Sequence, residues 1–582
     1  MCRLRRISIL NSEAPWLKYY GTMPHTLTYP DCSMVDMIEQ IAKKYPDQCA
    51  YSFMGERVDY RTMAAQIHQC ARALAASGIR RGDKVTICMP NTPHAILLFY
   101  ALNRIGAIPN MVHPLSSEGE IVFFVNESES VALLTLEQFY PKIRAIRDRI
   151  HLDLVIVASI KDYLSPVKRV GYALTVGRKI APVPETPGVV SWQTFLKRGE
   201  GYTSEYLCSL KGADPAAILY SGGTTGTTKG ILLSNLNFNA LALQTQAASG
   251  GIDRGDVMLA IMPIFHGFGL GVCIHTVLAY GCECVLVPQF TVDSVSKLLK
   301  KHRPQFIAGV PTLFEALLRN KHMQDIDLSC LKGVFSGGDS LSVELKRKVD
   351  AFLKQHGATI QVREGYGTTE CVTASCLTPK DFYKEGSIGI PFPDTFYKIV
   401  TPATQDEVPY GEVGEICISG PTVMQEYIHQ PRETAQTLQQ HDDGRIWLHT
   451  GDLGSMDEDG FLYFKQRLKR MIVTSGYNVY PSQIENIIDA HDAVLLSTVI
   501  GVKDDYKMQK VKAFVVLKPG VEPTEAVRQS IFLHCRKNIA KYAMPYEIEF
   551  RDSLPKTLVG KVAYTVLEKE EAEKAGVQKQ TG

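Results

Sequence analysis

Short apolar runs with strand character alternate with segments of helical periodicity along the first half of the chain. The helical pattern is clear where Met63, Ile67, Ala71 and Leu74 recur on one face, and Gly78 is placed to end that helix. The strand-like runs lie at residues 84–88, 154–157, 216–220, 284–287 and 306–310. Strands that alternate with helices are typical of proteins with buried, largely parallel sheets, so the pattern predicts an α/β fold.

The pattern of predicted elements changes after about residue 385. Short strands and turns follow, including 411–416 and 454–463, and they predict a β-rich lobe. A compact α+β tail begins near Met471, and its last fifteen residues, rich in Lys and Glu, are expected to fray. Because 582 residues exceed what a single core holds, we expect two domains. Residues 1–468 would form a large N-terminal domain of α/β sheet layers plus the β-rich lobe, and residues 469–582 a small mobile α+β C-terminal domain.

Composition is that of an ordinary globular protein. The 63 basic and 61 acidic side chains leave a net charge of +2, which favours no nucleic-acid partner. The 14 cysteines include no C-x-x-C pair and suit a reducing cytoplasm. The N-terminal sequence MCRLRRISIL contains too short an apolar run for a signal peptide. Its positive charge leaves a mitochondrial presequence open. The apolar stretch 270–287 contains His275 and Glu283 and predicts a buried helix followed by a strand, not a membrane span.

The loop SGGTTGTTKG, residues 221–230, lies between two apolar runs. Glycine lets backbone N–H groups approach a ligand closely, threonine hydroxyls add donors, and lysine supplies a charge that suits phosphate. The loop is not a Walker A sequence, because Gly226 is followed by Thr227 and Lys229 by Gly230. It is either a phosphate-binding loop of another kind or a Gly/Thr-rich surface hairpin.

The segment 165–180 combines apolar residues with four cations and no acid. Its cations are Lys168, Arg169, Arg178 and Lys179. Two interpretations stay open from sequence: a peripheral contact with a membrane surface, or a solvated helix face.

Six further motifs follow the Gly/Thr loop in a fixed order. They are PIFH at 263–266, SGGD at 336–339, REGYGTTE at 363–370, WLHTGD at 447–452, QRLK at 466–469 and PKTLVGK at 555–561. Each alone is a weak signal, but their order over some 340 residues is specific. Together they resemble the adenylate-forming superfamily of acyl-CoA synthetases, peptide-synthetase adenylation domains and beetle luciferases. The resemblance runs from about residue 30 to 570 and is closest to fatty-acyl and aryl-CoA ligases.

The resemblance implies an ATP site built from several of these motifs. Tyr366 would stack on adenine, Thr369 would bond the α-phosphate, and Asp452 would accept both ribose hydroxyls, since a carboxylate has two oxygens. Arg467 would brace the ribose or a phosphate through its planar fork. The residues assigned to ATP are Ser221, Gly222, Gly223, Thr224, Thr225, Gly226, Thr227, Thr228, Lys229, Gly338, Asp339, Gly365, Tyr366, Gly367, Thr368, Thr369, Asp452, Arg467 and Lys469.

The same resemblance assigns Mg²⁺ binding, catalysis and the acid site. Glu370 and Thr225 would bind Mg²⁺ through oxygen atoms. Lys561 would place an ammonium between the carboxylate and the α-phosphate and reduce their repulsion. The residues given catalytic roles are Lys561, Thr225, Glu370 and His266, and those expected to line the carboxylate channel are His266, Phe268, Gly337, Gly338 and Gly367.

The implied reaction has two steps. A carboxylate, with a medium- or long-chain fatty acid or an aryl acid expected, attacks MgATP to give acyl-AMP and pyrophosphate; coenzyme A then takes the acyl group and releases AMP. The C-terminal domain would rotate about Lys469 between the steps, so that Ser475, Gly476 and Tyr477 meet coenzyme A. Ser475 stands where many such ligases carry Lys, and Asn235 where His often follows the phosphate loop.

Three alternatives to a CoA ligase stay open. The first is an acyl-AMP ligase that loads the phosphopantetheine thiol of a carrier protein. The second is a luciferase-like oxygenase, although nothing in the sequence indicates oxygen chemistry. The third is a nucleotide-binding scaffold without turnover, which the joint presence of Lys561, Glu370 and Asp452 disfavours.

Overall fold

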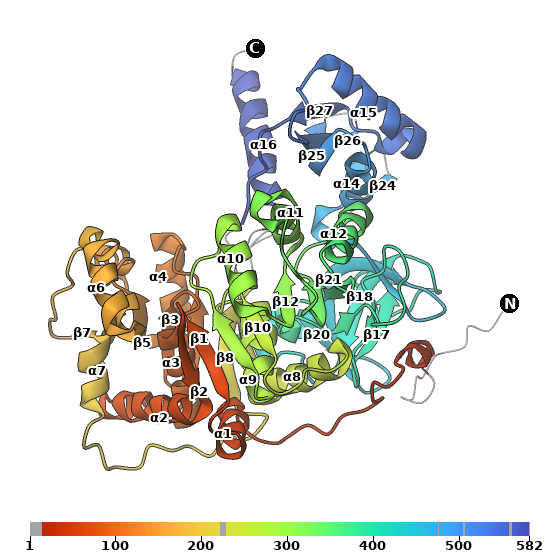
Figure 1. Ribbon diagram of the computed structural model, residues 1–582. Helices are drawn as coiled ribbons and strands as arrows, with labels where there is room; N and C mark the ends of the chain where they lie inside the picture. Colours follow the sequence, from red (N-terminus) through yellow and green to blue (C-terminus); the bar gives the residue numbers. More distant parts are fainter. Residues whose placement is uncertain (1–13, 222–227, 475–476, 505–506, 558–560, 581–582) are drawn as a thin grey trace.

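The computed structural model describes residues 14–221, 228–474, 477–504, 507–557 and 561–580. Within these ranges the strands form four sheets, two in a large α/β body, one in a β-rich lobe and one in the C-terminal segment (Figure 1). The predicted α/β fold with a large N-terminal part and a small C-terminal part is confirmed. The exact division at 468/469 stays a prediction.

The first sheet of the body has a parallel centre and antiparallel edges. Its order is β16-β15-β14-β13-β12-β10-β11-β1-β2, and every pair from β14 to β1 is parallel. The strands are β1 (Cys49–Phe53), β2 (Glu56–Asp59), β10 (Val257–Ala260), β11 (Glu283–Leu286), β12 (Phe306–Gly309), β13 (Gly333–Ser336), β14 (Val362–Tyr366), β15 (Cys376–Leu377) and β16 (Ile390–Pro391). The apolar runs expected at 284–287 and 306–310 therefore form β11 and β12 of one sheet, with β10 between them.

The second sheet contains the hairpin that frames the Gly/Thr loop. Its order is β19-β9-β8-β4-β3-β5-β6-β7; the β8–β9 and β9–β19 pairs are antiparallel and the others parallel. The strands are β3 (Lys84–Cys88), β4 (Ile108–Val112), β5 (Ser130–Leu136), β6 (Leu154–Ala158), β7 (Val189–Ser191), β8 (Pro215–Tyr220), β9 (Gly230–Ser234) and β19 (Glu426–Tyr427). The apolar residues after the loop thus form a strand, as predicted.

Helices cover and separate these sheets. They are α1 (Met34–Lys44), α2 (Tyr60–Ala76), α3 (Pro93–Ile105), α4 (Glu118–Glu127), α5 (Tyr140–Ala145), α6 (Pro166–Leu174), α7 (Trp192–Arg198), α8 (Asn235–Ser249), α9 (Val277–Ala279), α10 (Val292–His302), α11 (Pro311–Arg319), α12 (Val343–Gln355) and α13 (Pro431–Thr437). A π-helical segment, η5 (Phe268–Thr276), precedes α9 and β11, which confirms the helix-then-strand prediction for 270–287. In the described part of the chain no helix is both long and apolar enough to cross a membrane.

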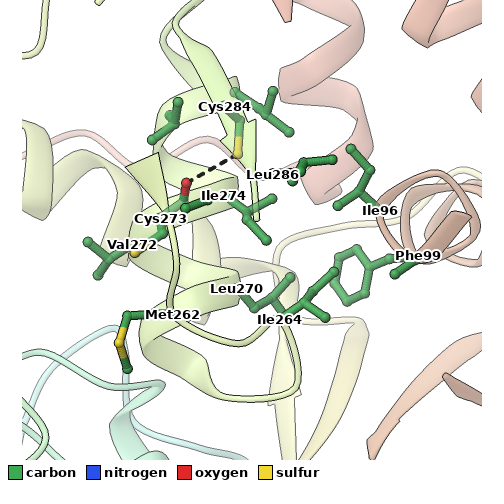
Figure 2. Packing of buried hydrophobic residues seen from close by; sticks show 14 of the residues in the cluster. Ile96, Phe99, Met262, Ile264, Leu270, Val272, Cys273, Ile274, Cys284 and Leu286 are labelled. Atoms are coloured by element: carbon green, nitrogen blue, oxygen red, sulfur yellow. Dashed lines mark hydrogen bonds between the residues drawn. The ribbon is translucent and has the colours of Figure 1, made fainter. Parts of the chain in front are cut away.

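Helix α3 is the centre of the main core. All its residues are buried, and it packs against α1, α2 and the strands β3 and β4. Local sequence defines its ends: Thr92 caps the N-terminus beside Pro93, and Gly106 ends the helix in the left-handed region with φ 77°. Figure 2 shows Ile96 and Phe99 of α3 near Ile264 and Leu270, which belong to the segment around η5. The acid-site candidates of that segment are therefore supported by a rigid, buried layer.

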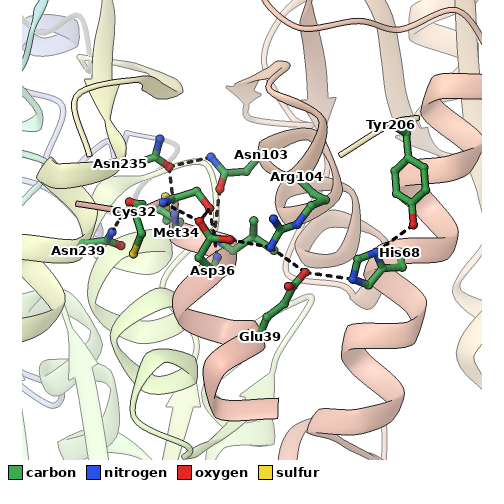
Figure 3. A network of polar contacts seen from close by, with 12 residues as sticks. Cys32, Met34, Asp36, Glu39, His68, Asn103, Arg104, Tyr206, Asn235 and Asn239 are labelled. Atoms are coloured by element: carbon green, nitrogen blue, oxygen red, sulfur yellow. Dashed lines mark hydrogen bonds and ion pairs between the residues drawn. The ribbon is translucent and has the colours of Figure 1, made fainter. Parts of the chain in front are cut away.

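A polar network joins helices that are far apart in sequence (Figure 3). Asn235, at the start of α8, accepts hydrogen bonds from the backbone N–H of Met34 at 3.0 Å and from Asn103 at 2.8 Å. Its own amide donates to the backbone carbonyls of Lys211 and Asp214. The Asn that replaces the expected His therefore connects α1, α3 and α8 behind the β8–β9 hairpin.

The β-rich lobe and the C-terminal segment each contain one further sheet. The lobe contains β17 (Phe396–Val400), β18 (Gly414–Ser419), β20 (Leu438–Gln440), β21 (Ile446–Met456) and β22 (Leu462–Arg467). The C-terminal segment contains β23 (Ile472–Thr474), β24 (Tyr477–Val479), β25 (Val494–Asp504), β26 (Met508–Leu517), β27 (Glu547–Phe550), α14 (Pro481–Asp489), α15 (Glu525–Asn538) and α16 (Tyr564–Gln580). The expectation that the last fifteen residues, 568–582, fray is wrong for their first part, because α16 continues through them and Glu571 is 8% exposed and lies 3.0 Å from Lys512 Nζ of β26.

Candidate active site

The Gly/Thr loop connects β8 to β9 on one side of the site. The two strands pair up to Tyr220 and Gly230, and the backbone N–H of Ser221 donates to the carbonyl of Lys229 at 3.4 Å. Thr228 and Lys229 are described. The other candidates of the loop lie outside the described residues: Gly222, Gly223, Thr224, Thr225, Gly226 and Thr227.

Lys229 and Glu370 are brought together by Tyr427, which sequence analysis missed. Lys229 Nζ lies 4.5 Å from the ring centroid of Tyr427 and 2.6 Å from Glu433 Oε2. The hydroxyl of Tyr427 donates to Glu370 Oε1 at 2.8 Å. Tyr427 belongs to β19, a two-residue strand whose pairing with β9 has no signature in the sequence. The candidate phosphate loop and the candidate Mg²⁺ ligand therefore lie on the same side of the site.

Tyr366 of the α/β body and Asp452 of the β-rich lobe form a hydrogen bond. Tyr366 ends β14, and its hydroxyl donates to Asp452 Oδ2 at 2.7 Å. Asp452, on β21, is 3% exposed, and its Oδ1 makes no hydrogen bond with any described residue, although Arg467 Nε lies 3.6 Å away. Burial raises the pKa of Asp452, and the charge of Arg467 opposes that shift. Asp452 therefore keeps one buried oxygen that can accept a ligand hydroxyl.

A strained turn follows Glu370 and links this motif to the acid-site segment. Val372 has φ 64° and ψ −58°, an unfavourable conformation for a β-branched residue, and the N–H of Thr373 donates to the carbonyl of Cys371. A Cβ atom on Gly267 would lie 1.7 Å from the carbonyl oxygen of Val372. A Cβ atom on Gly367 would lie 2.0 Å from the carbonyl oxygen of Thr373. Both glycines are therefore required by close backbone packing in this turn.

Lys561 reaches the body from the C-terminal segment. It lies next to a bridge between Lys556 and Val562, and its N–H donates to Thr557 Oγ1 at 3.1 Å. A Cβ atom on Gly338 would lie 3.6 Å from Lys561 Cε. Desolvation lowers the pKa of Lys561, and the charge of Asp339 opposes that shift. The side chain thus places a cation beside the SGGD motif.

His266 is a neutral donor near this cation. The backbone N–H of Phe268 donates to His266 Nδ1 at 3.1 Å, so the proton of the neutral ring lies on Nε2. Desolvation and the charge of Lys561 lower the pKa of His266 to about 3. The ring is therefore neutral near pH 7 and can donate a hydrogen bond from Nε2.

An apolar pocket that is partly open to solvent lies beside Gly338. It is lined by Thr245, Phe268, Val272, Phe335, Ser336, Gly337, Gly338, Gly365, Thr373, Ala374, Cys376, Leu377 and Phe392. Phe268, Gly337 and Gly338 were expected to contact the acid, and Gly365 was expected to contact ATP. His266 and Gly367 are not part of the lining, and their contact with the acid stays a prediction. Thr245, Phe335 and Phe392 had no signal in the sequence, because a pocket wall is assembled by packing.

The remaining candidates lie around the junction with the C-terminal segment. Arg467 ends β22, and Lys469 is exposed in the following turn, η8 (Leu468–Arg470). Thr368 and Thr369 are half-buried beside Glu370. Tyr477 begins β24, whereas Ser475 and Gly476 lie outside the described residues. The contact of these three with coenzyme A stays a prediction.

The side chains near Glu370 suit Mg²⁺ that is also bound by substrate phosphates, rather than a metal ion bound by protein ligands alone. In the described ranges no group of three or more His, Cys, Asp or Glu side chains could hold a metal ion. Mg²⁺ keeps several waters and is usually bound by one or two carboxylates together with substrate phosphates. A single carboxylate, Glu370, next to a phosphate loop fits that mode.

Comparison with known proteins identifies the class. The family described as AMP-binding enzyme matches residues 38–428, and the family described as AMP-binding enzyme C-terminal domain matches residues 483–561. The first match covers more than half of the chain. The chain therefore belongs to the AMP-binding enzyme family, and the expected resemblance to adenylate-forming enzymes is confirmed.

Relatives and solved structures agree with that assignment. A long-chain-fatty-acid–CoA ligase of Bacillus subtilis is 34% identical over 97% of this chain and 99% of its own. A long-chain-fatty-acid–CoA ligase of Escherichia coli O6:H1 is 33% identical over 94% of this chain and 96% of its own. ATP-bound MatB of Rhodopseudomonas palustris is 26% identical, with a TM-score of 0.76 over 92% of this chain and 98% of its own. The anthranilate CoA ligase AuaEII, at 24% identity and a TM-score of 0.81 over 96% and 99%, supports the fold alone.

Proposed function

We propose that this AMP-binding enzyme is an ATP-dependent acid–thiol ligase. It converts a carboxylic acid to an acyl-adenylate with release of pyrophosphate, and then transfers the acyl group to coenzyme A with release of AMP. The observation that carries this proposal is the position of Lys561, a cation of the C-terminal segment beside Gly338 at one end of an apolar pocket. The names of the relatives support the same reaction.

The residues divide the first step between them. The free oxygen of Asp452 accepts a ribose hydroxyl, and Tyr366 fixes the other oxygen. Lys229 neutralises phosphate charge, while Glu370 binds Mg²⁺, which supplies further charge neutralisation to the phosphates. Lys561 reduces the repulsion between the attacking carboxylate and the α-phosphate, and Nε2–H of His266 donates to an oxygen of the acid. Positioning and charge stabilisation are what this chemistry mainly requires.

The apolar pocket supports a fatty or aromatic acid as substrate. Its walls are mostly aliphatic and aromatic, as in sites that bind apolar ligands. The Bacillus subtilis and Escherichia coli relatives are named for long-chain fatty acids, which favours a fatty acid. The alternative acceptor is the phosphopantetheine thiol of a carrier protein, with the same adenylation step.

The experiment that tests this function is a substrate panel in which three products are measured. Acetate, decanoate, palmitate and cinnamate are each incubated with MgATP and coenzyme A, and pyrophosphate, AMP and acyl-CoA are measured. We expect AMP and pyrophosphate in equal amounts together with an acyl-CoA product. Adenylate that is trapped by hydroxylamine without any CoA thioester would favour the carrier protein, and no pyrophosphate with any acid would contradict the function.

We also propose that this enzyme is cytoplasmic and that residues 165–180 contact an anionic membrane surface. Helix α6 has no buried residue, and Val167, Val170, Leu174 and Val176 are 83%, 61%, 66% and 52% exposed. The β1–β2 turn extends this surface, because Met54 is 49% exposed and the ammonium groups of Lys168 and Lys301 both approach Gly55. Exposed apolar side chains among cations are typical of helices that lie on anionic lipid.

Vesicle sedimentation tests the membrane contact. Vesicles with phosphatidylglycerol should sediment the protein, and neutralising the four cations of 165–180 to Gln should abolish sedimentation. The control replaces four exposed lysines of the C-terminal segment, Lys503, Lys507, Lys537 and Lys541, with Gln. Equal loss of sedimentation in the control would contradict a local contact, and no sedimentation of the unchanged protein would contradict any contact.

A further inference from the structure

Two hydroxyl groups of the apolar pocket lack hydrogen-bond partners. Thr245 of α8 and Ser336 at the end of β13 both line the pocket and are only 7% and 1% exposed. Neither Thr245 Oγ1 nor Ser336 Oγ bonds to any described residue. Buried hydroxyls are nearly always bonded, so two such groups in the wall of one pocket require a physical reason.

Neighbouring polar groups show that the fold can satisfy such side chains. Thr276 Oγ1 donates to the carbonyl of Gly271 at 2.8 Å, and Ser249 Oγ donates to the carbonyl of Gln246 at 2.9 Å. Gln244, next to Thr245, donates to the carbonyl of Pro393 at 2.6 Å, although its Oε1 also lacks a partner among the described residues. Backbone carbonyls on helices are common partners for Ser and Thr, and Thr245 does not use one. Its hydroxyl is thus left without a protein partner, in a residue that lines the pocket.

We infer that the acid carries a neutral hydrogen-bonding substituent, a hydroxyl or keto group, that bonds to Thr245 and Ser336. The inference rests on the proposed function and specifies the class of its substrate. A charged substituent is disfavoured because no lining residue in the described part of the chain carries a charge. A plain alkyl chain would leave both hydroxyls unpaired after it displaces water, and a site built for a hydroxyl discriminates strongly against an analogue that lacks it.

The geometry favours a substituent away from the carboxylate. Ser336 precedes Gly337 and Gly338, and a Cβ atom on Gly338 would lie 3.6 Å from the side chain of Lys561, where the carboxylate is expected. Thr245 lies next to Gln244, which bonds to Pro393 beside the pocket residue Phe392. The substituent would therefore lie along the acyl chain or ring, between the SGGD motif and the wall formed by α8.

The test compares acids that differ only in the substituent. Decanoate is compared with 3-, 6- and 10-hydroxydecanoate, and phenylpropanoate with hydroxyphenylpropanoate, by kcat/KM for pyrophosphate release. Variants are Thr245→Val, which keeps the shape without the hydroxyl, the matched control Thr245→Ser, which keeps the hydroxyl, and Ser336→Ala. We expect at least one substituted acid to be preferred, and expect that preference to fall about tenfold in Thr245→Val and in Ser336→Ala but not in Thr245→Ser.

Several outcomes would overturn the inference. Preference for the unsubstituted acids, or a preference ratio that Thr245→Val and Ser336→Ala leave unchanged, would refute it while the proposed function stands. Absence of pyrophosphate release with every acid would refute the proposed function and this inference together. Because the readout is a ratio between two acids in one variant, partial loss of folded protein does not change it.

Discussion

Replacement of Lys561 by Met tests the role assigned to the C-terminal cation. Methionine keeps an unbranched side chain of similar length but removes the charge. In the present arrangement Lys561 is half-buried beside Gly338, and desolvation lowers its pKa, so its surroundings are less polar than water. Two unit charges 4 Å apart at an effective dielectric constant of about 20 interact by about 4 kcal/mol. Loss of that interaction in the transition state slows adenylation by about 10²- to 10³-fold.

The assay separates the two half-reactions. Adenylation is followed by pyrophosphate release, and thioester formation is followed from synthetic acyl-adenylate and coenzyme A. We expect Lys561→Met to lose the first activity and retain the second, since the resemblance implies that Lys561 leaves the site before thiol transfer. Lys556→Met is the matched control, because Lys556 is part of the same bridge but is exposed. An equal loss in both half-reactions, or an equal loss in the control, would refute the reasoning.

Three further predictions follow from individual contacts. Tyr366→Phe removes the hydrogen bond to Asp452 and should raise the KM for ATP about 2- to 10-fold; an unchanged KM would show that this hydrogen bond does not position Asp452 for ATP. Burial raises the pKa of Glu364 from 4.5 to about 8. Between these pH values the folded state keeps a proton that the unfolded state releases. The free energy of unfolding should therefore fall by about 1.4 kcal/mol for each unit by which the pH rises in this range. Glu364→Gln should remove that slope in urea unfolding between pH 5 and 8, and an unchanged slope would contradict the assignment. Gly267→Ala places a Cβ atom 1.7 Å from a backbone carbonyl oxygen and should destabilise the protein by about 3 kcal/mol. The control, Gly119→Ala, adds a Cβ atom in open space on an exposed helix position and should slightly stabilise the protein. Equal melting temperatures of the two variants would be inconsistent with this packing.

Local patterns predicted the elements because each depends on neighbours in sequence. The runs at 216–220 and 306–310 became β8 and β12, since a continuous apolar run between turn residues suits a buried strand. The helix predicted from Met63, Ile67, Ala71 and Leu74 became α2, with all four side chains buried. Motif order identified the family, because seven weak signals in one sequence order are improbable together.

Long-range pairing was beyond those patterns. Tyr427 contacts both Lys229 and Glu370 only because the two-residue strand β19 pairs with β9, some 195 residues earlier. The fraying expected for the last residues failed for the same reason: α16 is held by β25 and β26, through Leu567 just before that range and through Glu571 within it, which pairs with Lys512. A segment dominated by Lys and Glu contains too little local signal to show that packing.

The sequence alone determined the fold class, the family and the residue types available for chemistry, because strand runs, helical periodicity and motif order are properties of the linear chain. Only the tertiary structure decided which of those residues meet. It set the free oxygen of Asp452 beside Tyr366, brought Lys561 to Gly338, and left Thr245 and Ser336 unpaired in one pocket. Distances between such groups depend on how separate elements pack in three dimensions, and close packing is a property of the whole core rather than of any one segment.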